Sequence, residues 1–173
     1  MDSCAEDESD DAVIYGRSIK TCTLALGGQL FIWSMRRWVQ ASRDKTSISE
    51  ALASPYRAAK CIAATDVLDE LMSLIAAVSY RPVKIRCLPC PTLSSDEWLI
   101  LHSLQKIQSQ EETEAQKLIQ EFMVGRLAHT FLESATRYVD LLLCTGNPLI
   151  GASYLEVVKW KIDRHWNVIF NDS

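Results

Sequence analysis

The feature that most constrains this chain is the helical spacing of its apolar residues. Between residues 24 and 38, apolar or small residues recur at steps of three and four, namely Leu24, Gly28, Phe31, Met35 and Trp38. Such spacing places the side chains along one face of an α-helix. Helices predicted in this way cover residues 14–43, 56–78, 95–108, 112–124, 126–144 and 152–170. We therefore predict an all-α protein, a compact antiparallel bundle of about five to seven helices.

Two capping boxes mark predicted helix starts. Ser47 is followed by Glu50, and Ser94 by Glu97, each three residues later. In this motif the serine side chain accepts a hydrogen bond from the glutamate backbone N–H, and the glutamate side chain accepts one from the serine N–H. A short helix is expected after Ser47, with Pro55 either ending it or starting the next one.

The stretch between residues 80 and 91 departs from the helical pattern. Beyond Pro82, apolar and basic residues alternate in the run Val83-Lys84-Ile85-Arg86. This alternation is typical of extended chain, so we expect one short extended or strand-like arm near residues 82–87. The run Cys87-Leu88-Pro89-Cys90-Pro91 comes next and predicts a rigid turn.

Charge divides the chain into a short tail and a body. The first eleven residues hold six acids and no base, whereas the rest holds 16 acids and 18 bases. A segment this acidic cannot bury enough apolar surface to offset the entropy that it would lose on becoming ordered. We therefore predict that residues 1–12 form a disordered acidic tail and residues 13–173 a single helical domain. The tail could screen a basic surface of the body.

The sequence indicates a cytoplasmic location. An acidic N-terminus does not fit a secretory signal, which begins with basic residues. Even the longest uncharged stretches, such as residues 21–35, are shorter than the roughly 20 apolar residues that span a bilayer, so no transmembrane segment is expected. Six cysteines in such a chain should be mostly reduced thiols.

The pair Cys87 and Cys90 is the sharpest candidate for special chemistry. Two cysteines at this spacing can bind a metal or form a redox pair. A structural zinc site needs four ligands, so Cys61, His102 or Cys144 would have to complete it. The pair lacks the βαβ context of thioredoxin-like motifs. We favour a proline turn with two partly buried thiols, and keep zinc binding and thiol redox chemistry as alternatives. No other cofactor is predicted.

Motifs of the common enzyme classes are missing from the sequence. It has no HExxH zinc motif, no GxxxxGK[ST] phosphate loop and no GxGxxG dinucleotide loop. None of its three histidines accompanies a nucleophile motif, and we therefore lean against an enzyme. The near-neutral body and the pI of about 5.4 argue against nucleic acid as a partner, because DNA-binding domains are usually basic.

Two tryptophans lie off the apolar stripes of their predicted helices. Trp33 shares a side with Arg36 and Arg37, and Trp160 lies between two lysines. Tryptophan beside arginine is typical of the energetic centre of a protein–protein interface, although both tryptophans could instead pack at the edge of the core. We predict a non-enzymatic interaction or regulatory module that uses these four residues to bind another protein, or itself as a homodimer. A small-molecule-binding helical domain is a further alternative.

Overall fold

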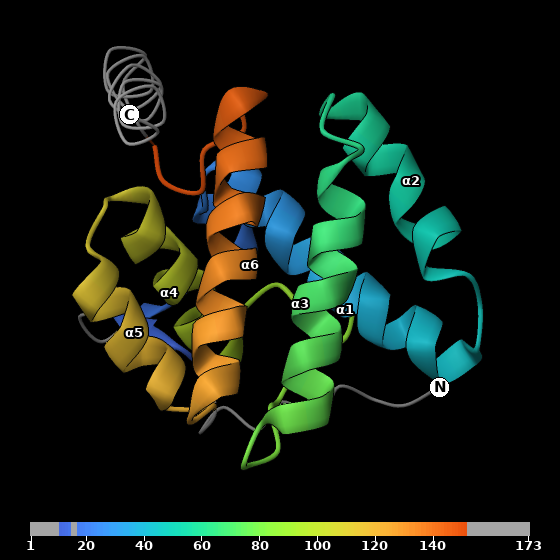
Figure 1. Cartoon of the computed structure of the whole chain (residues 1–173). Coiled ribbons are helices and arrows are strands. Elements are labelled where there is room, and N and C mark those ends of the chain that lie inside the picture. The colour runs from blue at the N-terminus through green and yellow to red at the C-terminus, as the bar shows by residue number, and fades with distance from the viewer. Residues whose placement is uncertain (1–10, 15–16, 152–173) are drawn as a thin grey trace, which may run out of the picture.

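Six α-helices make up most of the described part of the protein. The computed structural model describes residues 11–14 and 17–151. Its α-helices are α1 (Leu26–Asp44), α2 (Ile48–Ala58), α3 (Ala64–Val78), α4 (Ser95–Gln108), α5 (Glu112–Gln120) and α6 (Arg126–Cys144). They pack as a small bundle (Figure 1), which confirms the predicted all-α class. The helix predicted over residues 152–170 lies outside the described residues.

Both predicted serines cap their helices, and the motif at Ser94 is a complete capping box. Ser94 Oγ accepts a hydrogen bond from the N–H of Glu97 at 3.0 Å, and Glu97 Oε2 accepts one from the N–H of Ser94 at 2.9 Å. This complete capping box starts α4 at the predicted residue. At α2, Ser47 Oγ accepts from the N–H of Glu50 at 3.3 Å. Pro55 lies inside α2, which neither predicted alternative allowed.

The predicted helix over residues 14–43 is wrong in its first part. Two short antiparallel strands, β1 (Val13–Ile14) and β2 (Arg17–Ser18), and a 3₁₀ turn over Thr21–Thr23 come before α1. The N–H of Gly27, at the start of α1, donates to the backbone oxygen of Pro148 at 3.2 Å. The helix thus begins where a distant part of the chain supplies a hydrogen-bond acceptor, and the local sequence pattern cannot predict such a contact.

The helix predicted over residues 56–78 is two helices. Lys60 has a left-handed backbone, with φ of 57°, which ends the helical path after α2. The N–H of Cys61 then donates to the carbonyl oxygen of Tyr56 at 2.9 Å, closing the turn. The apolar spacing continues through this break because α2 and α3 both face the same core.

The core contains side chains from all six helices of the described part of the chain. Figure 1 shows α3 and α6 side by side and running in opposite directions. The hydroxyl groups of Tyr56 and Tyr138 share a hydrogen bond of 2.7 Å, and both side chains are fully buried. Burial, the largest cause, raises the pKa of both phenols, so they stay neutral. No helix among the described residues is long and apolar enough to cross a membrane.

The loop between α3 and α4 contains the extended arm that the sequence predicts. Val83 and Ile85 pack against the core, whereas Lys84 is exposed. The N–H of Lys84 donates to the Asp96 carboxylate at 2.7 Å, and the N–H of Arg86 donates to Glu97 at 3.1 Å. Side chains from the start of α4 therefore hold the arm in place.

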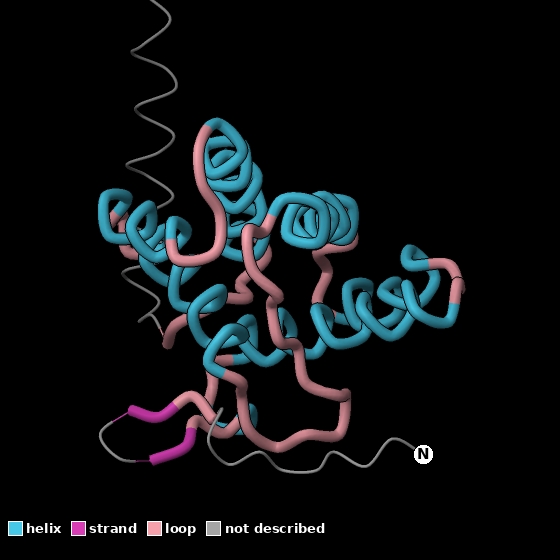
Figure 2. The backbone as a smooth tube through the Cα atoms, turned by 90° about the horizontal axis from the view of Figure 1, so that it is seen from below, coloured by secondary structure: helices cyan, strands magenta, loops and turns pink. Residues whose placement is uncertain are grey.

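The N-terminal hairpin lies against the end of this loop (Figure 2). The N–H of Ala12 donates to the oxygen of Leu93, and the N–H of Leu93 donates to Ile19, both at 3.0 Å. Ala12 is buried, and Asp11 forms an ion pair with Arg86. Residues 11 and 12 therefore pack against the end of the loop between α3 and α4.

Candidate functional site

A buried ion pair joins the middle of α1 to the start of α4. Arg36 is 3% exposed and Glu97 is fully buried. Nε of Arg36 donates to Oε1 of Glu97 at 2.7 Å and Nη2 donates to Oε2 at 2.9 Å, which is a bidentate arrangement. Each carboxylate oxygen also accepts a backbone N–H, one from Arg86 and one from Ser94. This full set of hydrogen bonds offsets the cost of burying the charges.

The same arginine anchors the cysteine turn. Nη1 of Arg36 donates to the carbonyl oxygen of Cys90 at 2.5 Å, and Nη2 donates to that of Thr92 at 2.7 Å. Arg36 is thus enclosed by the turn and by α4, and does not lie on the interaction surface predicted for it. The pattern of one helix could not show this, because the covering residues come from more than 50 positions later.

The predicted cysteine site is a pair. Cys87 and Cys90 lie at disulfide distance, with Cα atoms 5.6 Å apart, a separation usual for disulfides. Cys90 is buried and Cys87 is half-buried. Among the residues that the structure describes, no three His, Cys, Asp or Glu side chains are placed to hold a metal ion. The four-ligand zinc site considered from the sequence is therefore not assembled there.

The other candidate zinc ligands have different surroundings. Cys61 is buried in the core, and burial raises the pKa of its thiol. His102 stacks on Trp98 with ring centroids 5.0 Å apart. Cys144 is exposed at the end of α6. The structure thus does not bring these three residues together with Cys87 and Cys90.

An apolar groove opens beside Trp33, and we call it the Trp33 groove. Its volume is about 740 Å³, within the range of binding pockets. The start of α1 and the end of α2 form two sides, and the turns after α2 and α6 complete it. Its apolar lining comes from Leu26, Leu30, Trp33, Pro55 and Ala58. Leu26 is 68% exposed and Trp33 is half-buried, so apolar surface remains open to a partner.

The turn after α6 forms a fixed wall of the Trp33 groove. The Asn147 side chain donates to the carbonyl oxygen of Ala59 at 2.9 Å, which joins this turn to the end of α2. A Cβ atom on Gly27 would lie only 2.2 Å from the backbone oxygen of Asn147. Glycine is therefore needed for this close approach.

The remaining interface candidates lie outside the groove lining. Arg37 is half-buried, and its Nη1 donates to Oε1 of Gln40 at 3.0 Å on the surface of α1. Trp160 lies outside the described residues. Of the three predicted interface residues that the structure describes, Trp33 is the one that lines a groove.

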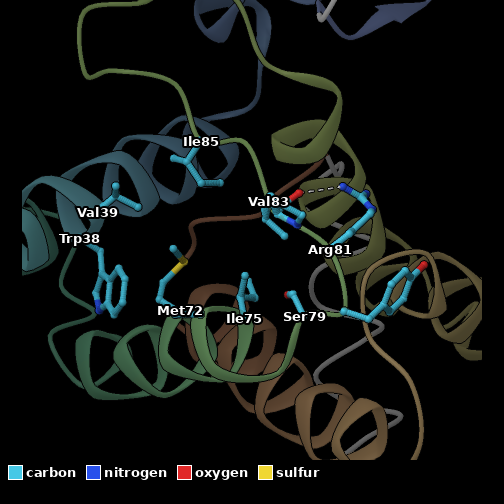
Figure 3. A pocket seen from close by; sticks show the side chains of 11 residues that line it. Trp38, Val39, Met72, Ile75, Ser79, Arg81, Val83 and Ile85 are labelled. Carbon is cyan, nitrogen blue, oxygen red and sulfur yellow. Dashed lines mark hydrogen bonds between the residues drawn. The ribbon is translucent and has the colours of Figure 1, made fainter. Parts of the chain in front are cut away.

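A second cavity, of about 380 Å³, lies between α1, α3 and the arm (Figure 3). Trp38, Met72 and Val83 are among its lining residues. Nε1 of Trp38 donates to Asp69 at 2.6 Å, so the polar edge of the indole is satisfied. Ser79 Oγ is buried without a hydrogen-bond partner among the described residues. Tyr80 and Arg81 also line the cavity, but Tyr80 and Arg81 both donate to the backbone oxygen of Glu121, and Arg81 pairs with Asp96. This lining does not select a ligand class.

No protein-family model, curated protein or solved structure matches the chain. Its function must therefore be argued from the groove and the turn. Sequence reasoning found Trp33 but missed Leu26 and Asn147, because the groove joins segments that are far apart in the chain. Gly27 and the segment Asn147-Pro148 meet at the groove wall.

Proposed function

We propose that this protein is a non-enzymatic interaction module whose Trp33 groove binds an apolar helix of a partner protein. The observation that carries this proposal is the open apolar surface that Leu26 and Trp33 present within one groove. A groove between two helices suits the apolar face of an amphipathic helix. Homodimer formation and a cytoplasmic location stay predictions.

The properties of the two side chains favour binding. Trp33 packs against the core on one side, so its ring is held in place before a partner arrives. A fixed aromatic ring loses little entropy on binding, and tryptophan is enriched among residues that dominate interfaces. Burying an exposed leucine such as Leu26 contributes about 1.5–3 kcal/mol.

Selection of displayed peptides against the full chain tests this proposal. The library would hold helix-forming peptides of about 20 residues with randomised faces. We expect enrichment of apolar residues at positions i, i+3, i+4 and i+7, and loss of binding with Leu26→Asp. Leu127→Asp is the matched control, because Leu127 is also an exposed leucine in the first turn of a helix, α6, but does not line the groove. Selected peptides that bind both variants equally would contradict the proposal.

Thiol redox chemistry is the second candidate function, supported by the Cys87–Cys90 pair at disulfide distance. In this role the disulfide accepts two electrons and two protons from a dithiol. Cys87 and Cys90 become thiols and the dithiol becomes a disulfide. Half-buried Cys87 would be the sulfur that is attacked, and buried Cys90 would leave as the thiolate.

Titration of the native protein in glutathione buffers of graded ratio tests this second role. We expect reversible loss and recovery of two thiols, and neither change in Cys87→Ser. The other cysteines serve as an internal reference for general oxidation. A pair that stays oxidised in the native protein under excess dithiothreitol would exclude the role.

A further inference from the structure

The Trp33 groove carries charge of one sign. Among the described residues that line it, Lys60 is the one ionisable side chain, and it is exposed just beyond the end of α2. The chain segments that form the groove, residues 12–43, 51–65 and 141–151, contain no aspartate or glutamate. The groove therefore presents a positive charge beside its apolar surface, with no carboxylate from its own segments to balance it.

Lys60 is also the accessible hydrogen-bond donor of the groove. Its ammonium group takes part in none of the ion pairs among the described residues. The side-chain amides of Gln29 and Asn147 and the hydroxyl group of Thr145 line the groove too, but they donate to backbone oxygens within the protein. The hydroxyl oxygen of Thr21 is buried. A partner in the groove would therefore meet the donor of Lys60 first.

We infer that the partner helix of the Trp33 groove carries an acidic side chain beside its apolar stripe, and that this carboxylate pairs with Lys60. The inference rests on the proposed function, since it names the chemistry of the same partner. It makes the groove selective for acidic amphipathic helices over neutral and basic ones.

The selectivity follows from the hydration of the lysine. A helix that lies over the groove removes water from around the Lys60 ammonium group, and loss of that hydration costs free energy unless a counter-charge replaces it. A carboxylate on the partner supplies this counter-charge, whereas a basic side chain at the same place is repelled. The penalty against the wrong partner contributes to selectivity as well as the attraction for the right one.

The backbone that carries Lys60 is held in place. Its N–H donates to the carbonyl oxygen of Arg57 at 3.0 Å. The carbonyl oxygen of Ala59, one residue earlier, accepts the hydrogen bond of 2.9 Å from the Asn147 side chain. Because the charge starts from a fixed point at one end of the groove, the acid should be needed at one position of the partner helix and not along its whole length.

The displayed-peptide selection, run on the natural chain and on Lys60→Glu, tests the inference. We expect the natural chain to enrich aspartate or glutamate at one position beside the apolar stripe, and Lys60→Glu to enrich lysine or arginine at that position. Arg57→Glu is the matched control. Arg57 is likewise an exposed base near the end of α2 without an ion pair among the described residues, but it does not line the groove. This control should select the same acidic peptides as the natural chain.

The affinities of one selected acidic peptide and of its acid-to-amide variant measure the pairing directly. Lys60→Gln should weaken binding of the acidic peptide about threefold, as expected for a partly exposed ion pair. It should leave binding of the amide variant unchanged, which also shows that the protein is folded. Arg57→Gln should leave the affinity for both peptides as it is in the natural chain.

Selected helices without a preference for an acid, or an acidic preference that Lys60→Glu leaves unchanged, would overturn the inference. Loss of their binding in Leu26→Asp would still uphold the proposed function. Self-association of the natural chain that Leu26→Asp abolishes would make a second copy the occupant, and would overturn the inference as well. Peptides that bind without regard to Leu26 would end the proposed function itself.

Discussion

Trp33 and Arg36 are three residues apart on α1, yet their surroundings are opposite. Arg36 is enclosed by charged and polar partners, and four of its hydrogen bonds tie α1 to α4 and to the cysteine turn. Trp33 lines a groove whose apolar surface is open. The comparison teaches that a helix can hold the fold together with one side chain and present a binding surface with its near neighbour.

The largest expected effect is on the Arg36 side. Arg36→Ala leaves Glu97 buried without its counter-charge, and breaking one half of a buried pair lowers the free energy of unfolding by about 3–5 kcal/mol. Urea unfolding of the purified variant measures this loss. Arg37→Ala is the control and should change stability by less than about 0.5 kcal/mol. Equal losses of unfolding free energy in the two variants would contradict the difference proposed between the buried and the surface arginine.

The cysteine turn beside Arg36 should contribute a smaller amount. A disulfide that closes a loop of four residues stabilises a protein by about 2 kcal/mol in the chain-entropy model. We expect unfolding in the presence of a dithiol reductant to show that loss for the natural chain. The double variant Cys87→Ser/Cys90→Ser should be insensitive to reductant. If the oxidised and reduced forms of the natural chain were equally stable, the turn would be held in place by Arg36 alone and not by the disulfide.

The buried tyrosine pair beside α1 predicts that the free energy of unfolding depends on pH. Phe31 of α1 packs on Tyr138 with ring centroids 5.5 Å apart, and Tyr138 bonds to Tyr56. Both tyrosine pKa values are raised in the folded state, so the unfolded chain releases these protons first. Stability is therefore full below pH 10 and falls above it, by about 1.4 kcal/mol per pH unit for each phenol.

Chemical unfolding between pH 8 and pH 11 measures this slope. Tyr56→Phe/Tyr138→Phe should flatten it, whereas Tyr80→Phe should not, because Tyr80 is 56% exposed. A slope that is the same in all three proteins would contradict the assignment to the buried pair.

The smallest effect on stability is expected in the Trp33 groove. Leu26→Asp replaces a 68% exposed side chain at the first residue of α1, where a carboxylate interacts favourably with the helix dipole. The free energy of unfolding should change by no more than about 0.5 kcal/mol. Thermal and urea unfolding check this, and a loss similar to that of Arg36→Ala would mean that the groove surface belongs to the core.

The same comparison shows how far the sequence can lead. Local patterns predicted the class, the start of α4 and the bounds of α6, because caps and apolar spacing act within a few residues. They did not predict the hairpin before α1 or the break at Lys60, which depend on partners elsewhere in the chain. For the same reason, the local pattern predicted the same interface role for Trp33 and Arg36. Only packing against residues 90–97 and 145–149 separates their roles.

The most direct test of the central claim is the affinity of one groove-selected peptide for three full-length proteins: the natural chain, Trp33→Ala and Arg37→Ala. Removal of a central interface tryptophan makes the free energy of binding less favourable by about 2 kcal/mol or more, so Trp33→Ala should raise the dissociation constant about thirtyfold. Arg37→Ala should change it less than about twofold, since Arg37 does not line the groove. Equal affinities for the natural chain and Trp33→Ala would contradict the account of the Trp33 groove as a binding surface.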